Sequence, residues 1–317
     1  MSTAQHFYGV DVAKAELVIA CKGQAQTHTI ANKAEAICAW LKTLPPGSAV
    51  AMESTGRYHQ LLAQLATAGG CIAYVLNAKD VSFYAKALGG RSKTDRVDAH
   101  VIARFIAEHH EGLHPWKRAE PRAGEIWELL LRRADIVKHR ASLRQAMRDA
   151  PTIAHAASQF DQSFDALLQA IDERIKALHK QDEQMAQAST RLQTIKGVGP
   201  QGGAMLAALF SRIPFANADA LVAYSGLDPR AHDSGQKKGR RRLSKRGPPP
   251  LRRQAYLMAK AACKSKVFKP TYEALKARGL ACTQALVIMA RKLLRVAFAV
   301  YKSGKPFDEA LIARAMV

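Results

Sequence analysis

The stretch HFYGVDV at residues 6–12, followed by LVIA at residues 17–20, determines the fold of the N-terminal part of the chain. Both runs are short, apolar and rich in β-branched or aromatic residues, which favours strands over helices. Only four residues separate them, so we expect a hairpin-like pair. The run at residues 26–30 is a candidate third strand beside this pair.

Helical and strand-like runs then alternate up to residue 110. We expect a helix over Ala34–Leu44, a strand over Ala49–Met52, a helix over Tyr58–Ala68, a strand over Ile72–Leu76, and a helix opening near Asp95. This order predicts an α/β fold, with a mixed sheet that has helices on its faces. It is also the order of the ribonuclease-H-like fold.

The pattern changes to long helices between about residues 118 and 193. Apolar residues there, Leu143 and Leu167 among them, are spaced to meet a partner helix, and the sequence around Pro151 divides the run into two arms. The remainder is mostly helical, apart from a Gly-, Lys- and Arg-rich stretch at residues 233–250. We therefore predict three domains, at residues 1–115, 116–192 and 193–317.

The basic charge is concentrated near the C-terminus. The net charge is +22, and residues 230–266 hold 13 Lys or Arg side chains against one acid, Asp233. Such a cluster suits a phosphate backbone, because neutralising phosphates releases counterions. An anionic membrane surface is the weaker alternative. A solvated tail is disfavoured because apolar helical patterns continue for 50 residues beyond the cluster.

Other compositional features exclude several classes of protein. No apolar run is long enough to span a bilayer, and residues 1–9 lack an export pattern, so we expect a cytoplasmic protein. The five cysteines are scattered without a CxxC pair, which argues against a disulfide framework or a zinc site.

Four acids occupy positions that this architecture could bring together. Asp11 ends the first apolar strand, and Glu53 follows the strand at residues 49–52. Asp95 and Asp98 open a helix, with a spacing that puts them on one helix face. Like charges repel, so a cluster of four is costly unless a cation lies between them, and Mg²⁺ prefers such oxygen ligands. Separately, Asp95 could simply cap its helix and Asp98 could be solvated.

Two further features could contact nucleic acid. Gly197 and Gly199 precede a helix of small residues, so their backbone could hold a phosphate in a helix-hairpin-helix turn, or simply connect two packed helices. Ser244 lies among Arg and Lys side chains, which would stabilise charge on a phosphoryl transition state. From the residues alone, Ser244 could be a nucleophile or a plain phosphate contact.

Six short segments together resemble the insertion-sequence transposases of the "IS-one-ten" family, which includes Piv-like DNA invertases. They occur in the family's order and extend over nearly the whole chain, at residues 9–14, 53–56, 93–99, 195–200, 224–230 and 243–256. The run Pro248–Pro250 is a departure, since relatives usually carry fewer prolines just after the serine. All four acids of the family's motif are present.

The resemblance implies a RuvC-like N-terminal domain whose Asp-Glu-Asp-Asp metal site matches Asp11, Glu53, Asp95 and Asp98. It also implies a coiled-coil spacer and a C-terminal transposase domain in which Ser244 matches the nucleophile. Members of the family form homodimers and homotetramers, in which the carboxylates of one subunit face the serine of another. Several use a structured bridge RNA to select target and donor DNA.

We therefore expect a DNA transposase or site-specific recombinase that uses Ser244 and carboxylate-bound Mg²⁺ to cleave and rejoin strands, guided by a bridge RNA. A hydrolytic junction nuclease and a non-catalytic nucleic-acid-binding protein are the alternatives. The residues expected to contact nucleic acid are Gly197, Gly199, Lys237, Lys238, Arg240, Arg241, Arg242, Lys245, Arg246, Arg252 and Arg253.

Overall fold

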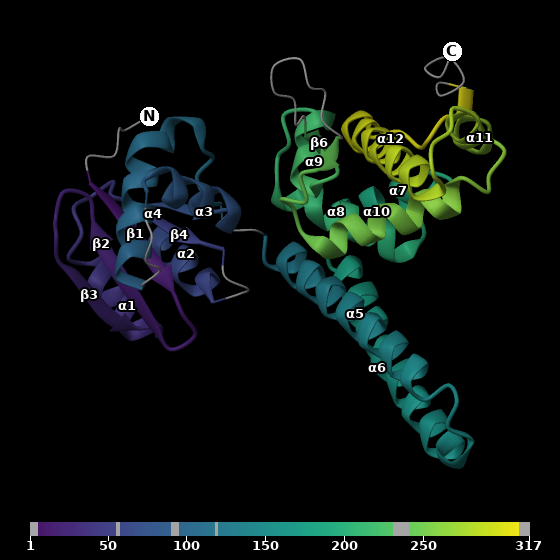
Figure 1. Ribbon diagram of the computed structural model, residues 1–317, viewed down its shortest axis with the longest axis horizontal. Coiled ribbons are helices and arrows are strands. Elements are labelled where there is room, and N and C mark those ends of the chain that lie inside the picture. Colours follow the sequence, from purple (N-terminus) through teal and green to yellow (C-terminus); the bar gives the residue numbers. More distant parts are fainter. Residues whose placement is uncertain (1–5, 55–57, 90–94, 118–119, 231–240, 311–317) are drawn as a thin grey trace. The chain divides into compact units, whose positions relative to one another are not determined.

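The computed structural model describes residues 6–54, 58–89, 95–117, 120–230 and 241–310, and of residues 95–97 it describes the backbone alone (Figure 1). The chain divides into two compact units, Met1–Arg118 and Ala119–Val317. Among the described helices, none combines the length and the apolar character needed to cross a membrane.

The first unit is built on a five-stranded mixed sheet. Its order is β3-β2-β1-β4-β5; β1 pairs antiparallel with β2 and parallel with β4, so β1 lies at the centre. The predicted mixed sheet is confirmed, and so is the predicted order of strands and helices as far as β5. The strands are β1 (Phe7–Val12), β2 (Glu16–Cys21), β3 (Thr27–Ala31), β4 (Ala49–Glu53) and β5 (Ile72–Leu76).

Helices cover both faces of this sheet. Successive strand residues point to opposite sides, and the apolar residues of β4 are buried on both. Val50 and Met52 of β4 pack in a core with α1 (Ala34–Leu41) and α2 (His59–Ala68). Ala49 and Ala51, which alternate with them, pack in a second core with α3 (Ala78–Ala87) and α4 (Asp95–His109). The sequence analysis missed α3, where Val81 is the one fully buried side chain.

The second unit is mostly helical, and its helices pack around one hydrophobic core. Every residue of α8 (Pro200–Arg212) from Gly202 to Phe210 is buried, which makes α8 its central helix. The other helices around this core are α7 (Glu183–Gln193), α9 (Ala218–Ser225), α10 (Pro249–Ala262), α11 (Lys269–Ala277) and α12 (Cys282–Ser303).

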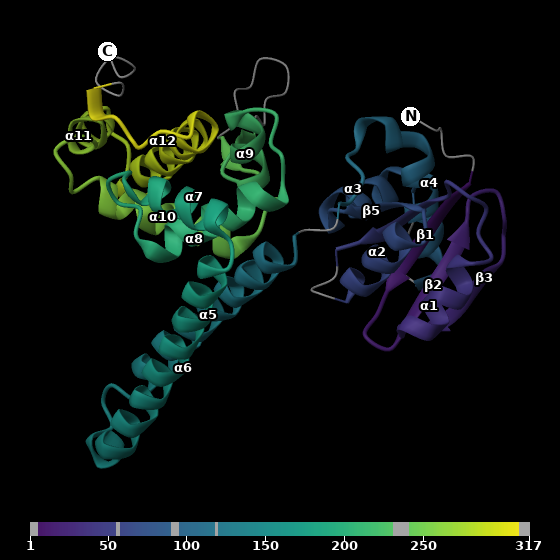
Figure 2. The same cartoon turned by 180° about the vertical axis from the view of Figure 1, so that it is seen from behind.

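Two long helices extend from this core as an antiparallel pair, visible from both sides (Figures 1 and 2). They are α5 (Pro121–Ala146) and α6 (Ala154–Lys180), joined through a short 3-10 helix at Pro151–Ile153. The predicted division near Pro151 is therefore confirmed. Leu143 and Leu167, which we expected to pack against a partner helix, are instead exposed, because their positions face away from the contact stripe.

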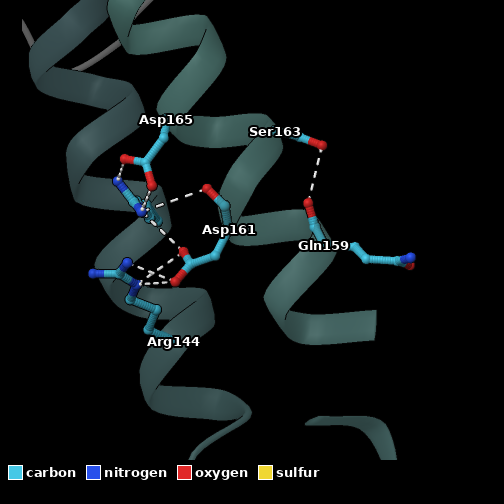
Figure 3. A network of polar contacts seen from close by, with 6 residues as sticks. Arg144, Gln159, Asp161, Ser163 and Asp165 are labelled. Atoms are coloured by element: carbon cyan, nitrogen blue, oxygen red, sulfur yellow. Dashed lines mark hydrogen bonds and ion pairs between the residues drawn. The ribbon is translucent and has the colours of Figure 1, made fainter. Parts of the chain in front are cut away.

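Ion pairs join the outer part of this helical pair (Figure 3). Arg140 Nε lies 2.9 Å from Asp161 Oδ1 and Arg140 Nη1 lies 2.6 Å from Asp165 Oδ1. Arg144 Nε donates to the same Asp161 carboxylate, 2.6 Å from Oδ2. Nearer the core, Arg133 pairs with Asp172 at 2.8 Å. The residue numbers of the paired side chains rise along α5 as they fall along α6, so the ion pairs fix the register of the antiparallel helices.

These contacts predict an acid-dependent contribution to stability. Hydrogen bonds from Arg144 and Arg140 hold the pKa of Asp161 below its ordinary value of 3.8, and the bonds from Arg140 lower that of Asp165. A lowered pKa in the folded state stabilises the protein above pH 3.8, and this contribution disappears as the pH falls below that value. The double substitution Asp161→Asn with Asp165→Asn should therefore lower the Tm at pH 5, by an amount that shrinks towards pH 3.

Thermal unfolding of wild type and variant across this pH range tests the prediction. Asp135→Asn, which removes an exposed carboxylate from α5, is the control and should shift the Tm little at either pH. A Tm difference that stays constant with pH would show that these ion pairs do not stabilise the helical pair.

Candidate active site

Asp11 and Glu53 lie on neighbouring parallel strands and face the same side of the sheet. The register pairs Gly9 with Ala51 and Val10 with Met52, so its continuation places Asp11 beside Glu53. Side chains two residues apart on a strand share a face. Glu53 therefore faces α4 with Ala51, and Asp11 faces α4 with Gly9. Both acids are partly buried.

Helix α4 crosses this face in direct contact with the backbone of β1. A Cβ atom added to Gly9 would lie 2.2 Å from the Ala103 nitrogen and 2.3 Å from the Ala99 oxygen, so only glycine allows the approach. Asp98, which directly precedes Ala99, is partly buried. Asp98 therefore belongs to the turn of α4 that contacts Gly9.

The fourth acid, Asp95, is the first residue of α4, and its side chain lies outside the described residues. Among the side chains that are described, no group of three or more His, Cys, Asp or Glu residues is arranged to hold a metal ion. Carboxylate oxygens on one face are nevertheless the donors that hard divalent cations prefer. The donor set fits such a cation, and the complete four-acid site stays a prediction.

The contact at Gly9 can be tested by adding a single methyl group. Gly9→Ala forces the backbones of β1 and α4 apart, so we expect a loss of about 3 kcal/mol or more in the free energy of unfolding. Chemical denaturation measures the loss. In the same unit Gly112→Ala meets no atom within 4 Å, and should change stability by less than about 0.5 kcal/mol. Equal effects of the two substitutions would contradict the role given to Gly9.

In the second unit, Ser244 is held by a two-stranded ribbon rather than displayed on an open loop. Strand β6 (Pro229–Arg230) pairs antiparallel with β7 (Arg242–Leu243), and Ser244 follows β7 directly. Ser244 is only 8% exposed. Its hydroxyl donates a hydrogen bond to Asp228 Oδ1, and its backbone nitrogen donates to the Asp228 carbonyl oxygen at 2.9 Å.

Backbone contacts fix the turn after the serine against the end of α9. Lys245 has a φ of 52°, the one positive value among the described non-glycine residues, and its nitrogen donates to the Gly226 oxygen at 3.0 Å. A Cβ atom on Gly247 would lie 1.6 Å from the Tyr224 oxygen. The Arg246 nitrogen is 3.5 Å from Ser244 Oγ. The serine therefore has a defined position and orientation.

Two arginines on other helices interact with the residues around the serine. Arg252 of α10 donates through Nη1 to the carbonyl oxygens of Gly247 and Ser225, and burial lowers its pKa. Burial also lowers the pKa of Arg291 on α12, as does the neighbouring cation Arg295, while the Asp228 carboxylate raises it. These cations lie near the serine, where a phosphate would carry negative charge.

The prolines after the serine begin a helix. Pro248 precedes α10, and Pro249 and Pro250 are its first two residues. Proline suits these positions because its missing N–H would have no partner within the helix, and its fixed φ matches the helical value. The predicted irregular stretch at residues 233–250 therefore ends earlier than expected.

The remaining predicted nucleic-acid contacts differ in their surroundings. Gly197 has a φ of 94°, and a Cβ there would lie 2.4 Å from the Ala262 nitrogen, so close packing on α10 accounts for this glycine. Gly199 precedes α8 in open space, so its contact with phosphate stays a prediction. Of the cations predicted to contact nucleic acid, four are exposed: Arg241, Arg242, Lys245 and Arg253. Arg246 is partly buried. Lys237, Lys238 and Arg240 lie outside the described residues.

Asp228 is the hydrogen-bond partner of Ser244 that the sequence analysis did not single out. It lies in one of the six quoted segments, at residues 224–230, but it was assigned no role. A signal was present, because Asp228 and Asp233 are the only acids between residues 220 and 272. An acid within such a cationic region is expected to have a specific partner.

The acids on the sheet and the oriented serine among cations belong to an enzyme of the transposase class, which acts on DNA. Residues 8–150 match a family model described as "Transposase", and residues 189–273 match one described as "Transposase IS116/IS110/IS902 family". The chain belongs to the IS110 family of transposases. The first family is named for an Asp-Glu-Asp-Asp set of acids (DEDD). Membership indicates a ribonuclease-H-like fold and use of a divalent metal.

Two curated relatives cover most of the chain. The pilin gene-inverting proteins of Moraxella bovis and Moraxella lacunata are each 26% identical to it over 266 residues. Each alignment covers 81% of this chain and 81% of the relative. The similarity therefore extends through both units.

Proposed function

We propose that this transposase cleaves and rejoins DNA strands by attack of Ser244 on a phosphodiester, with Mg²⁺ held by Asp11, Glu53, Asp95 and Asp98. The observation that carries the proposal is the hydrogen bond from the buried Ser244 hydroxyl to Asp228, because a serine becomes a good nucleophile when an acceptor takes its proton. A covalent serine–DNA bond conserves the energy of the broken linkage, so strands rejoin without ATP.

The carboxylates of the first unit and the cations of the second have separate tasks in this proposal. Divalent metal on the acids would neutralise charge on the reacting phosphate. Cations near Ser244, such as Arg241, Arg242 and Arg253, hold the DNA backbone, since they are exposed and each can neutralise a phosphate. The first unit is then a RuvC-like domain, α5 and α6 form a coiled-coil spacer, and residues 193–317 form the transposase domain.

The same proposal includes assembly and a guide. We expect homodimers and homotetramers, in which the acids of one copy serve the serine of another, and a structured bridge RNA that pairs with target and donor DNA. The basic residues 230–266 suit RNA as well as DNA, since both present phosphates. The Moraxella relatives are named for inversion of a pilin gene, which makes DNA inversion a candidate outcome beside insertion and excision.

Substitution of the serine tests the nucleophile. Ser244→Ala should abolish recombination and the covalent protein–DNA adduct, which a denaturing gel of the wild-type reaction should reveal. Ser163→Ala, which removes a hydroxyl bonded to Gln159 on the distant α6 (Figure 3), should leave both unchanged. If Ser244→Ala still cleaves and leaves free ends, the enzyme is a hydrolytic nuclease; if it recombines normally, Ser244 is not the nucleophile.

Substitution of the sheet acids tests the metal site. Asp11→Asn and Glu53→Gln keep the shape of each side chain and remove its charge, so each should lower strand transfer by about 100-fold or more while DNA binding persists. EDTA should abolish the wild-type reaction, and added Mg²⁺ should restore it. Glu16→Gln, at the exposed start of β2, is the matched control. Full activity of the Asp11 and Glu53 variants would favour a non-catalytic role for these acids.

A further inference from the structure

We propose that Asp228 is a catalytic residue, which orients the Ser244 hydroxyl and accepts its proton during attack on DNA. This inference rests on the proposed function, since it requires Ser244 to be the nucleophile. Neither residue alone suggests the role, because a serine in a basic region can bind phosphate directly and an aspartate beside a strand can serve a turn.

Two hydrogen bonds link the same pair of residues. The Ser244 nitrogen donates to the Asp228 carbonyl oxygen at 2.9 Å, and the Ser244 hydroxyl donates to Asp228 Oδ1. Pairing of Pro229 with Leu243 places the two residues side by side at the end of the ribbon. The backbone bond therefore fixes the distance between the two short strands. The bond to the carboxylate orients the hydrogen of the Ser244 hydroxyl.

A cationic side chain from a helix lies near the Asp228 carboxylate. That side chain is Arg291 of α12, and two further cations, Lys245 and Arg246, directly follow the serine in the sequence. Arg291 lies close enough to Asp228 for the two charges to interact, and its Nε has no hydrogen-bond partner among the described residues. Arg291 thus interacts with the Asp228 carboxylate through its charge, and Oδ1 accepts the bond from Ser244.

The proton balance of the step is simple. Ser244 Oγ forms a bond to phosphorus as its proton passes to Asp228 Oδ1, and the bond from phosphorus to one bridging ribose oxygen breaks. That ribose oxygen leaves as a hydroxyl after taking a proton from solvent. On rejoining, a ribose hydroxyl attacks phosphorus and loses its proton to solvent, while Ser244 Oγ departs and recovers its own proton from Asp228.

A structural role is the competing explanation, in which Asp228 only holds β7 against β6. The two roles make opposite predictions for two substitutions. Asparagine is isosteric with aspartate and its amide oxygen can accept the same hydrogen bond, but it is not a base. Glutamate is one methylene longer but keeps the carboxylate.

The experiment compares rates of covalent adduct formation on a DNA substrate in the complete protein with Mg²⁺. Asp228→Asn should slow adduct formation by about 100-fold or more, as expected for loss of a general base, with DNA binding and Tm close to wild type. Asp228→Glu should retain more activity than Asp228→Asn. Asp219→Asn is the control, because it removes an exposed carboxylate that pairs with Arg295 at 2.7 Å, and it should react at the wild-type rate.

The outcomes separate this inference from the function it rests on. Suppose that Ser244→Ala is inactive, as the proposed function requires. The proton-acceptor role of Asp228 is then overturned if the Asp228→Asn variant reacts within about tenfold of the wild-type rate, or faster than the Asp228→Glu variant. An active Ser244→Ala would instead overturn the proposed function. If Asp228→Asn fails to fold, wild-type adduct formation measured in heavy water decides: slower attack supports transfer of the serine proton, and an unchanged rate contradicts it.

Discussion

The close approach of two backbones at Gly9 is the constraint on which the first unit depends. Helix α4 contacts β1 without an intervening side chain, since Ala103 and Ala99 occupy the space that a Cβ would need. This contact sets how near the helix lies to the sheet, and so how near Asp98 comes to the strands that carry Asp11 and Glu53. The distance of Asp98 from the sheet therefore depends on packing at a residue that has no side chain.

The second unit uses the same device around its serine. Gly247 lies even closer to the Tyr224 carbonyl than Gly9 lies to α4, and Gly226 ends α9 with a φ of 70°. Both units thus fix a polar residue by pressing backbone against backbone beside it. Such contacts cannot adjust through side-chain rotation, so the backbone that carries Ser244 has little freedom to move.

Sequence predicted the sheet, the helical pair and most helices, because their apolar residues recur with the periods of strands and helices. It missed α3, in which Val81 alone is fully buried, since one buried position gives no periodic signal. The candidate acids and Ser244 were found from sequence and resemblance. The bond between Asp228 and Ser244 was missed because the ribbon that joins them has strands of two residues, too short to show alternation.

The prolines that begin α10 restrict how the region beside the serine can bind an anion. A helix usually presents free amide hydrogens at its N-terminus, but Pro249 and Pro250 have none. The start of α10 therefore lacks two amide donors that could otherwise bind a phosphate oxygen. An anion near Ser244 would meet long guanidinium and ammonium groups, such as those of Arg242 and Lys245, rather than the first amides of α10.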